Sequence, residues 1–555
     1  MLNFLSFLNK TSESIDPLTN RKTAMQWLAS LPNTDPTENH AEILNALIRL
    51  RNKDTEYNPD SLDVLLALDE YAQPIQKTLC RQYLRNTRIS TAVEAKLWQA
   101  IYTYYHEISL AYYSHINTII AEPSLIKQHA FLPIMTVRAL HNLGNLFKWR
   151  FFHYEQPDEK LWRMLHKLFQ HADNQHYADQ SVLMYEDKPS KCTAQYIRAL
   201  LLTQIHPSAL PAREIEIADH WLKKWIHLVK LEKHPKFTQH HFYVDPSQPT
   251  GAMPVIDKIY PETFLCWDAS VLLGQLRRTQ DELHTTHNQA ESQLNLAEHL
   301  KMLDYLERQW DPINLGKLRK SPRLAVKKVL NVIHGFNKIC SAVKDTAEDT
   351  EHIQEFDADI KYAEMVDIQL YGFVTDATRN RQHQSVPKPH LTEVACENWG
   401  VEDESREGYR THIPSIKNDW LRLSRLVAVR ADGEKSWKLG VVRRLFRAPA
   451  EGTRAGMEII AQHPAVLMLH IAHAPRTPQL SLTNDISAID DNLPIPVLMT
   501  TSIINGQFNL IIDGAQYSGN RTFKVTMGHE THLVKLAHVL EKGDTWLHVQ
   551  AIITY

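Results

Sequence analysis

Residues 403–413 read Asp403-Glu-Ser405-Arg-Glu-Gly408 followed by Tyr409-Arg-Thr-His-Ile, a DxSxxG stretch that runs straight into a strand-like segment. Such a stretch is typical of a turn, because aspartate and serine side chains bond to nearby backbone and glycine accepts positive φ. Upstream, Arg319-Lys-Ser-Pro-Arg323 places two arginines four positions apart, at the end of a long helical region. The organisation of the chain depends on whether these two stretches belong to one site.

The glycines are distributed unevenly along the 555 residues. Five of the 17 lie in residues 1–350, and the other twelve lie in the last 205 residues. Helices avoid glycine, whereas β-turns and bulges favour it. We therefore expect a long helical first part and a last part that is mostly β.

Apolar residues at helical spacing support the first half of this expectation. The tyrosines of residues 104–113 follow this spacing, and we expect them in the core. Residues 235–261 hold several prolines and predict an ordered loop. The helical patterns lie at residues 61–73, 90–120, 133–153, 157–171, 192–205, 212–231 and 283–311. Successive helices with short links predict an antiparallel or solenoid-like array.

Strand patterns dominate after residue 324, between turns that are rich in glycine and small residues. Residues 344–355 are acidic and residues 379–389 are polar, so both stretches are expected to form loops. The predicted strands lie at residues 324–335, 365–372, 421–430, 437–447, 456–460, 497–501, 508–512, 523–527 and 547–553. The fold class predicted is a multidomain α+β protein.

Composition narrows the function. The formal net charge is −3, so no global field favours DNA or a membrane surface. The five cysteines are scattered, which fits a reducing compartment, and no apolar run reaches membrane length. We therefore expect a cytoplasmic protein without a membrane span.

Residues of about 319–470 resemble a PilZ domain, the bacterial receptor module for cyclic di-GMP. The resemblance rests on Arg319-xxx-Arg323, on Asp403-x-Ser405-xx-Gly408, on Leu439-Gly-Val-Val-Arg-Arg and on Gly456-Met-Glu-Ile-Ile, in the family's order. It implies a β-barrel and covers roughly a quarter of the chain. The helical part is also similar to long proteobacterial proteins that carry such a module near the C-terminus.

The resemblance implies that Arg319, Arg323, Asp403, Ser405 and Gly408 bind cyclic di-GMP. Guanidinium groups match phosphate oxygens or guanine O6 and N7 in a bidentate way, and a carboxylate can accept from guanine N–H groups. A serine hydroxyl can donate to a phosphate, and a glycine lets backbone approach the ligand. Two neighbouring lysines would add attraction for phosphate. They are Lys317 and Lys320.

The distance between the two motifs departs from the family's pattern. Arg323 and Asp403 are 80 positions apart, so residues from about 344 to 394 would be an insertion in the barrel. A rival placement uses Arg379 and Arg381, which lie nearer to Asp403 but with RxR spacing. The predicted domains are a helical scaffold at 1–311, a PilZ-like barrel at 312–475 and a small β domain at 476–555.

The predicted function is a non-enzymatic receptor that couples cyclic di-GMP binding at the barrel to a helical region that binds an unidentified protein partner. The alternative is a protein-interaction scaffold with a degenerate barrel that binds no nucleotide. No cofactor is expected. The tightest histidine groups, His240-His241 and His529-Glu-Thr-His532, lack the spacing of a metal site, so no metal is expected either.

Overall fold

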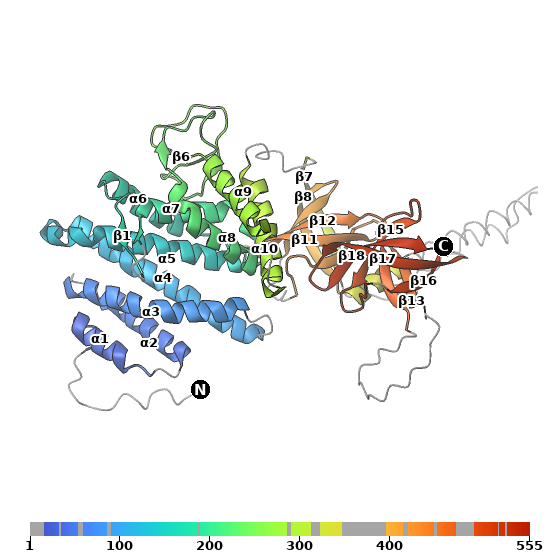
Figure 1. Cartoon of the computed structure of the whole chain (residues 1–555), viewed down its shortest axis with the longest axis horizontal. Helices are drawn as coiled ribbons and strands as arrows, with labels where there is room; N and C mark the ends of the chain where they lie inside the picture. Colours follow the sequence, from blue (N-terminus) through green and yellow to red (C-terminus); the bar gives the residue numbers. More distant parts are fainter. Residues whose placement is uncertain are drawn as a thin grey trace, which may run out of the picture. The chain divides into compact units, whose positions relative to one another are not determined.

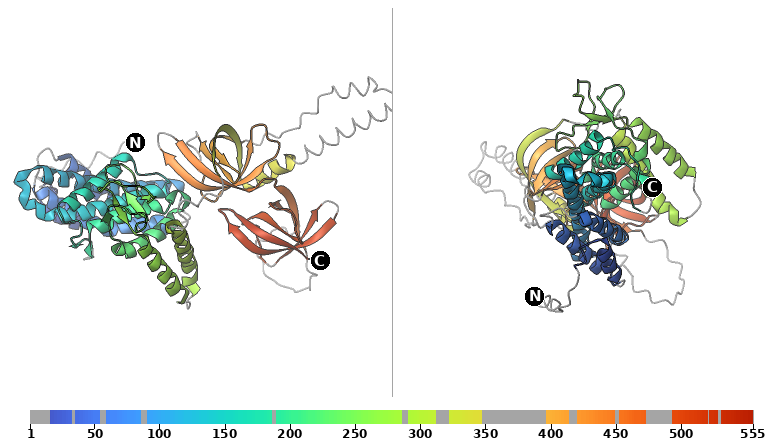
Figure 2. Two further views of the ribbon diagram at one scale, coloured as in Figure 1. Left: turned by 90° about the horizontal axis from the view of Figure 1, so that it is seen from above. Right: turned by 90° about the vertical axis from the view of Figure 1, so that its left-hand side faces the viewer.

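The chain divides into two compact units, Met1–Leu318 and Arg319–Tyr555. The computed structural model shows a helical first unit and a β-rich second unit (Figures 1 and 2). The residues that the structure describes are 16–32, 35–53, 59–85, 90–185, 189–285, 290–311, 322–346, 396–413, 420–448, 452–472, 493–519, 521–527 and 530–554.

The first unit confirms the helical prediction. The helix predicted from Ser90 begins there, since the Ser90 side chain accepts from the backbone N–H of Val93 and caps α4. The helices are α1 (Arg21–Ser30), α2 (Pro36–Lys53), α3 (Pro59–Arg85), α4 (Thr91–Ala121), η1 (Pro123–Phe131), α5 (Leu132–Phe152), α6 (Glu159–Asn174), α7 (Cys192–Gln204), η2 (Pro207–Ala209), α8 (Ala212–Trp225), η3 (Ile226–Leu228), α9 (Ser270–Thr285) and α10 (Ala290–Trp310).

Helix α5 forms the centre of this unit, because its neighbours bury nearly all of its side chains, the polar ones included. It packs against α4, α6, α7 and α8. Of the tyrosines predicted in the core, Tyr104, Tyr105 and Tyr112 are buried. The hydroxyls of Tyr104 and Tyr112 both donate to the buried carboxylate of Asp69, at 2.9 and 2.6 Å.

The helical unit also contains short strands that the sequence analysis did not predict. Strands β1 (Val182–Leu183) and β2 (Pro189–Ser190) form one pair. Strands β3 (Glu232–Lys233), β4 (Phe242–Val244), β5 (Met253–Pro254) and β6 (Leu265–Trp267) form a sheet in the order β3-β6-β4-β5. The loop predicted at 235–261 therefore contains two strands of this sheet, and the region is not purely helical.

Six strands of the second unit close into an antiparallel barrel, with the order β10-β11-β12-β9-β8-β7. Its core includes Trp399, Val442 and Leu445, because alternate residues of each strand point inward. The strands are β7 (Leu324–His334), β8 (Glu397–Ser405), β9 (Gly408–Ile413), β10 (Leu426–Ala431), β11 (Lys438–Ala448) and β12 (Gly452–Ala461). The barrel fold implied by the family resemblance is confirmed.

A second closed barrel follows, with the order β13-β14-β15-β18-β17-β16. The sequence analysis predicted a small β unit here but not β13 and β17. Because β13 pairs with β14 and β16, we propose that the boundary between the barrels lies before β13, not at residue 475. The strands are β13 (Ala465–Ile471), β14 (Ile495–Met499), β15 (Gln507–Asp513), β16 (Thr522–Met527), β17 (Glu530–Lys542) and β18 (Trp546–Thr554).

The two barrels share a hydrophobic core. Phe336 and Ile339, from the helix at residues 336–346 that follows β7, are buried in one cluster with Leu498, Ile511 and Trp546 of the second barrel. The indole N–H of Trp546 donates to the backbone carbonyl of Ser424 at 2.9 Å. The second unit is therefore one packed body with two barrels.

Several predictions fall on residues that the structure does not describe. The strand at 365–372 and the loop at 379–389 are among them, and only residues 344–346 of the insertion proposed at 344–394 are described, as the end of a helix. The domain boundaries thus remain proposals. Among the described helices, none combines the length and the apolar character needed to cross a membrane.

Candidate functional site

Antiparallel pairing of β7 with β8 brings the two motifs together. Leu324 pairs with Glu404 and Ala325 pairs with Asp403, so the residue just before β7 lies beside the DxSxxG stretch. Arg323 Nη1 donates to Asp403 Oδ1 at 2.6 Å, and the two side chains are 34% and 20% exposed. Strand pairing thus brings together two residues that are 80 positions apart in the sequence, and their ion pair is partly exposed to solvent.

The remaining basic candidates lie outside the described residues. They are Lys317, Arg319, Lys320, Arg379 and Arg381. Their part in the site stays a prediction, and so does the choice between the two placements of the arginine motif.

Ser405 and Gly408 form the ends of a hairpin between β8 and β9. They pair with each other across a two-residue loop, and the Ser405 hydroxyl accepts a long bond of 3.4 Å from the Glu407 N–H. A Cβ atom at Gly408 would lie only 1.9 Å from the carbonyl oxygen of Met457 on β12. Gly408 does not have positive φ. Glycine is therefore required here by the close approach of β12, and not by the turn conformation considered from the sequence.

Strand register continues the site across the outer face of the barrel. Asp403 pairs with Arg410 on β9, Arg410 pairs with Gly456 on β12, and Gly456 pairs with Arg444 on β11. Directly paired residues point to the same face of a sheet. Arg410 and Arg444 are exposed, so this face is the solvent side. We call Arg323, Asp403, Arg410, Gly456 and Arg444 the arginine row.

Gly456 leaves an open step in the middle of the arginine row. A Cβ atom there would lie 3.3 Å from Cβ of Arg444, whose aliphatic stem passes over the glycine. Arg410 Nε lies 3.0 Å from Glu402, and its Nη1 lies 4.0 Å from Asp403. Within the described part of the chain, Arg444 makes no ion pair. The row therefore presents three guanidinium groups and one carboxylate along a shallow surface.

A second set of charges closes the barrel end beside Asp403. Lys328 forms an ion pair with Glu404 and lies 5.2 Å above the ring of Tyr409. Lys438 donates to the Tyr409 hydroxyl at 3.3 Å and to Glu434 at 2.8 Å. Burial acts to lower the pKa of Lys438, but its bonds to Glu434 and Tyr409 raise it overall. These lysines are engaged with the barrel and hold the strand ends in place.

The sequence analysis did not single out Arg410 and Arg444, which the strand register places on the same face as Asp403. Both stand in segments that were predicted as strands, Arg410 two residues after Gly408 and Arg444 within Leu439-Gly-Val-Val-Arg-Arg. Alternation along β9 places Arg410 on the face of Gly408, which was a usable signal. The position of Arg444 depends on a bulge in β11 between Val442 and Arg444, which alternation alone does not predict.

Comparison with known protein families finds one match in each unit. Residues 22–236 match the N-terminal domain of the cyclic-di-GMP receptor FimW, and residues 336–465 match its middle PilZ domain. The chain belongs to the cyclic-di-GMP receptor FimW family. The two matches together cover more than half of the chain. No curated protein and no solved structure matches it.

The FimW assignment covers most of the arginine row. Asp403, Ser405, Gly408, Arg410 and Arg444 all fall within the matched PilZ residues, whereas Arg323 precedes them. The protein is a FimW-family cyclic di-GMP receptor with a PilZ domain, and the family assignment favours this function over a barrel that has lost its ligand.

Proposed function

We propose that this receptor binds cyclic di-GMP along the arginine row, with Arg319 joining from the residues that precede β7. The observation that carries the proposal is the contact between Arg323 and Asp403, which joins the two halves of the motif. Arg410 and Arg444 extend the same face by two strands. Three guanidinium groups in a row suit a ligand with two phosphates and two guanine bases.

Each member of the row has a chemical role in this proposal. Arg410 and Arg444 donate to phosphate oxygens, with bonds that are charge-assisted on both sides. Asp403 accepts from the N–H groups of a guanine edge, and Arg323 leaves Asp403 to bind phosphate or guanine. The Arg323–Asp403 pair is partly exposed, so breaking it costs only about 1 kcal/mol or less.

Ser405 and Gly408 shape the surface. The Ser405 hydroxyl is half-buried and makes only long contacts of 3.4 and 3.5 Å, so it can turn to donate to a phosphate. Gly408 lets β12 approach β9 closely, which sets the position of Gly456 beside Arg410. Lys317 and Lys320 would add attraction for phosphate, and Arg379 and Arg381 are the alternative partners of Arg319.

We also propose that ligand binding is coupled to the helical region. Arg319 and Arg323 lie in the connection from α10 to β7, so a ligand that holds both arginines fixes this connection. A ligand shifts such an equilibrium only if it contacts one state better than the other, and the two arginines would supply that difference. The receptor would act in the cytoplasm, without catalysis, on a protein partner of the helical region.

Isothermal titration calorimetry with cyclic di-GMP tests the site. We expect the wild type to bind, and Arg410→Ala and Arg444→Ala each to weaken binding at least about tenfold, since each removes a charge-assisted bond. Lys435→Ala, an exposed lysine in the turn between β10 and β11, is the matched control. Unchanged affinity in both arginine variants would place the ligand elsewhere on the barrel.

A further inference from the structure

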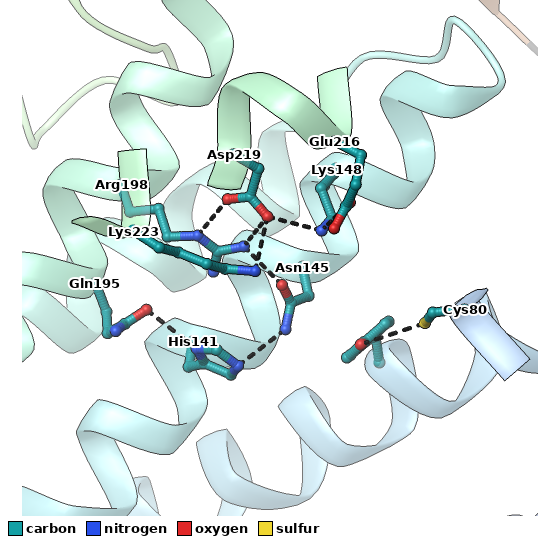
Figure 3. Close-up of polar contacts among 10 residues, drawn as sticks. Cys80, His141, Asn145, Lys148, Gln195, Arg198, Glu216, Asp219 and Lys223 are labelled. Atoms are coloured by element: carbon teal, nitrogen blue, oxygen red, sulfur yellow. Dashed lines mark hydrogen bonds and ion pairs between the residues drawn. The ribbon is translucent and has the colours of Figure 1, made fainter. Parts of the chain in front are cut away.

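The helical unit contains a cavity of about 1380 Å³ that the cyclic dinucleotide site does not use. It is lined by α3 on one side, by α8 on another, and by α5 and the β1–β2 pair between them. All of these elements belong to the first unit. Figure 3 shows polar contacts among residues that line one part of it and residues that lie behind them.

The charge of the cavity is strongly unbalanced. Among the described residues that line it, seven are lysine or arginine and one, Glu216, is a carboxylate. Three of the cations, Lys77, Arg81 and Arg85, are spaced four residues apart on α3 and form one exposed stripe of about 12 Å. Neither Arg81 nor Arg85 makes an ion pair with a described residue. The wall formed by α3 can therefore bind the carboxylates of a ligand.

The opposite wall carries cations that are held by a buried carboxylate. Asp219 lies 2.7 Å from Lys148 Nζ, 2.6 Å from Arg198 Nε and 2.9 Å from Lys223 Nζ (Figure 3). Lys148 also contacts Glu216, at 2.6 Å. Three cations thus share two carboxylates, and the excess positive charge stands beside the cavity.

Lys223 is the cation of this group that reaches the cavity most openly, with a side chain 43% exposed. Burial of its stem by the surrounding helices and the charges of Lys148 and Arg198 lower its pKa, Asp219 opposes the shift, and the net pKa is about 8. A nearby anion favours the charged form of a lysine. The three cations Lys148, Arg198 and Lys223 face only two carboxylates, Asp219 and Glu216, and an acidic ligand would therefore supply the missing negative charge.

A chain of hydrogen bonds fixes the remaining polar wall. A guanidinium can only donate, so the amide oxygen of Asn145 accepts the bond from Arg198. The NH₂ group of Asn145 then donates to His141 Nε2, and His141 Nδ1–H donates to the amide oxygen of Gln195. Burial lowers the pKa of His141 well below its usual value, in agreement with this neutral tautomer. The wall is rigid and contributes no negative charge.

Apolar side chains lie between the charges. They are Leu84, Met184, Ile217 and Ile226. We propose that this cavity binds an acidic segment of a protein partner, with carboxylates on the α3 stripe and on Lys223 and with apolar side chains on the leucine, methionine and isoleucines. The site is separate from the arginine row and does not depend on it.

Size favours a peptide segment over a small phosphorylated ligand. Pockets for small molecules measure about 300–1,000 Å³, which is less than this cavity. The basic stripe extends over two helical turns, and a single phosphate would reach only one or two of its cations. An amphipathic segment in a groove uses apolar anchors and flanking charges together, which is the combination found here.

Three fluorescein-labelled 15-residue peptides test this with the full chain. All share leucines on one helical face and differ on the other, which carries glutamate, glutamine or lysine. We expect fluorescence anisotropy to show binding of the glutamate peptide, binding at least tenfold weaker for the glutamine peptide, and none for the lysine peptide. Equal affinity for the glutamate and glutamine peptides would overturn the proposal.

Charge reversal locates the binding. Arg81→Glu combined with Arg85→Glu should abolish binding of the glutamate peptide. Lys191→Glu, at the far rim of the cavity, should weaken this binding, and it provides the test if the double variant does not fold. Lys160→Glu with Lys230→Glu changes net charge equally at exposed positions that do not line the cavity, and should leave binding unchanged. Equal loss in this control, or displacement of the peptide by millimolar pyrophosphate, would overturn a peptide site in favour of a non-specific or small-anion site.

Discussion

The guanidinium of Arg323 and the carboxylate of Asp403 lie 2.6 Å apart, although 80 positions separate them in the chain. The contact is a direct result of the pairing of β7 with β8, in which Ala325 stands opposite Asp403. The two residues therefore occupy the same end of the barrel before any ligand binds. A ligand that binds both must exchange one protein ion pair for its own contacts.

Substitution of Arg323 or Asp403 by alanine is expected to weaken cyclic di-GMP binding strongly. Each variant removes one charged partner of the ligand, and hydrogen bonds to charged groups contribute about 1.5–3 kcal/mol. The dissociation constant should rise about tenfold or more in each case. Isothermal titration calorimetry measures this directly.

Lys435→Ala serves as the control here as well, since it removes an exposed charge away from the arginine row. Thermal melting without ligand should show both site variants folded, because the ion pair is partly exposed and contributes little to stability. If either alanine variant binds as tightly as the wild type, that residue has no place in the ligand site.

Gly408→Ala is expected to destabilise the first barrel even without ligand. The new Cβ would lie 1.9 Å from the carbonyl oxygen of Met457, so β9 and β12 must separate. Forced overpacking of this kind costs about 2 kcal/mol or more. Urea unfolding of the variant measures the loss.

Gly400→Ala provides a matched control on β8. Its Cβ would meet only the His412 carbonyl oxygen, at 3.8 Å, which is ordinary contact. The free energy of unfolding should change by about 0.5 kcal/mol or less. Equal losses in the two variants would show that strand glycines matter in general and that the approach of β12 is not the cause.

The sequence was sufficient for those features that depend on local pattern. Glycine distribution separated helical from β regions, and Ser90 marked the start of α4. The pairing of Arg323 with Asp403 was accessible only through the family resemblance, because no local signal joins residues so far apart. Strands β3 to β6 were not predicted from the sequence, because each is only two or three residues long and a periodic pattern cannot be recognised over so few residues.

The second barrel and the arginine row show a different limit. Strand β17 contains charged and apolar residues in an alternation that two irregularities in its register interrupt, so its sequence does not repeat cleanly. Arg444 joins Arg410 only through the β11 bulge and the open step at Gly456. Such cross-strand neighbours depend on register, and register is a property of the assembled sheet.

The contact between the barrels can be measured through Arg443 and Glu541. Arg443 forms a two-pronged contact with Glu541 of β17, one bond of which is 2.9 Å long. The side chains are 32% and 30% exposed, so solvent screens the pair in part and we expect a coupling energy of about 1 kcal/mol. A double-mutant cycle of Arg443→Ala and Glu541→Ala, followed by urea unfolding, gives this value.

Glu458→Ala is the control for that cycle, since Glu458 also accepts from Arg443, at 2.7 Å, but lies within the first barrel. It should leave the coupling between Arg443 and Glu541 intact. Because the barrels share a hydrophobic core, both barrels of the wild type should unfold in one transition. Additive losses in the cycle, or two separate transitions, would show that the barrels are energetically independent.

Buried histidines should make the helical unit sensitive to acid. His40 and His166 are 2% and 1% exposed. Burial lowers the pKa of each, although the bond that His40 Nε2–H donates to the Gln76 amide oxygen, and the bond that His166 Nε2–H donates to the Thr250 carbonyl oxygen, oppose the shift. In the unfolded chain a histidine takes up its proton below about pH 6.5. Below that pH the unfolded state binds more protons, so stability falls as the pH drops from about 6.5 to 5 and does not change from this source above about pH 7.5.

His166→Gln separates this effect from general acid destabilisation. The variant keeps a polar side chain near Tyr196 and Thr250 but cannot titrate, so its melting temperature should fall less steeply between pH 6.5 and 5. Circular dichroism at 222 nm follows the helical unit, and one histidine held neutral accounts for about 1.4 kcal/mol per pH unit below its unfolded pKa. His129→Gln, at an exposed position, should retain the wild-type slope. An identical slope in all three proteins would mean that His166 accepts its proton in the folded state.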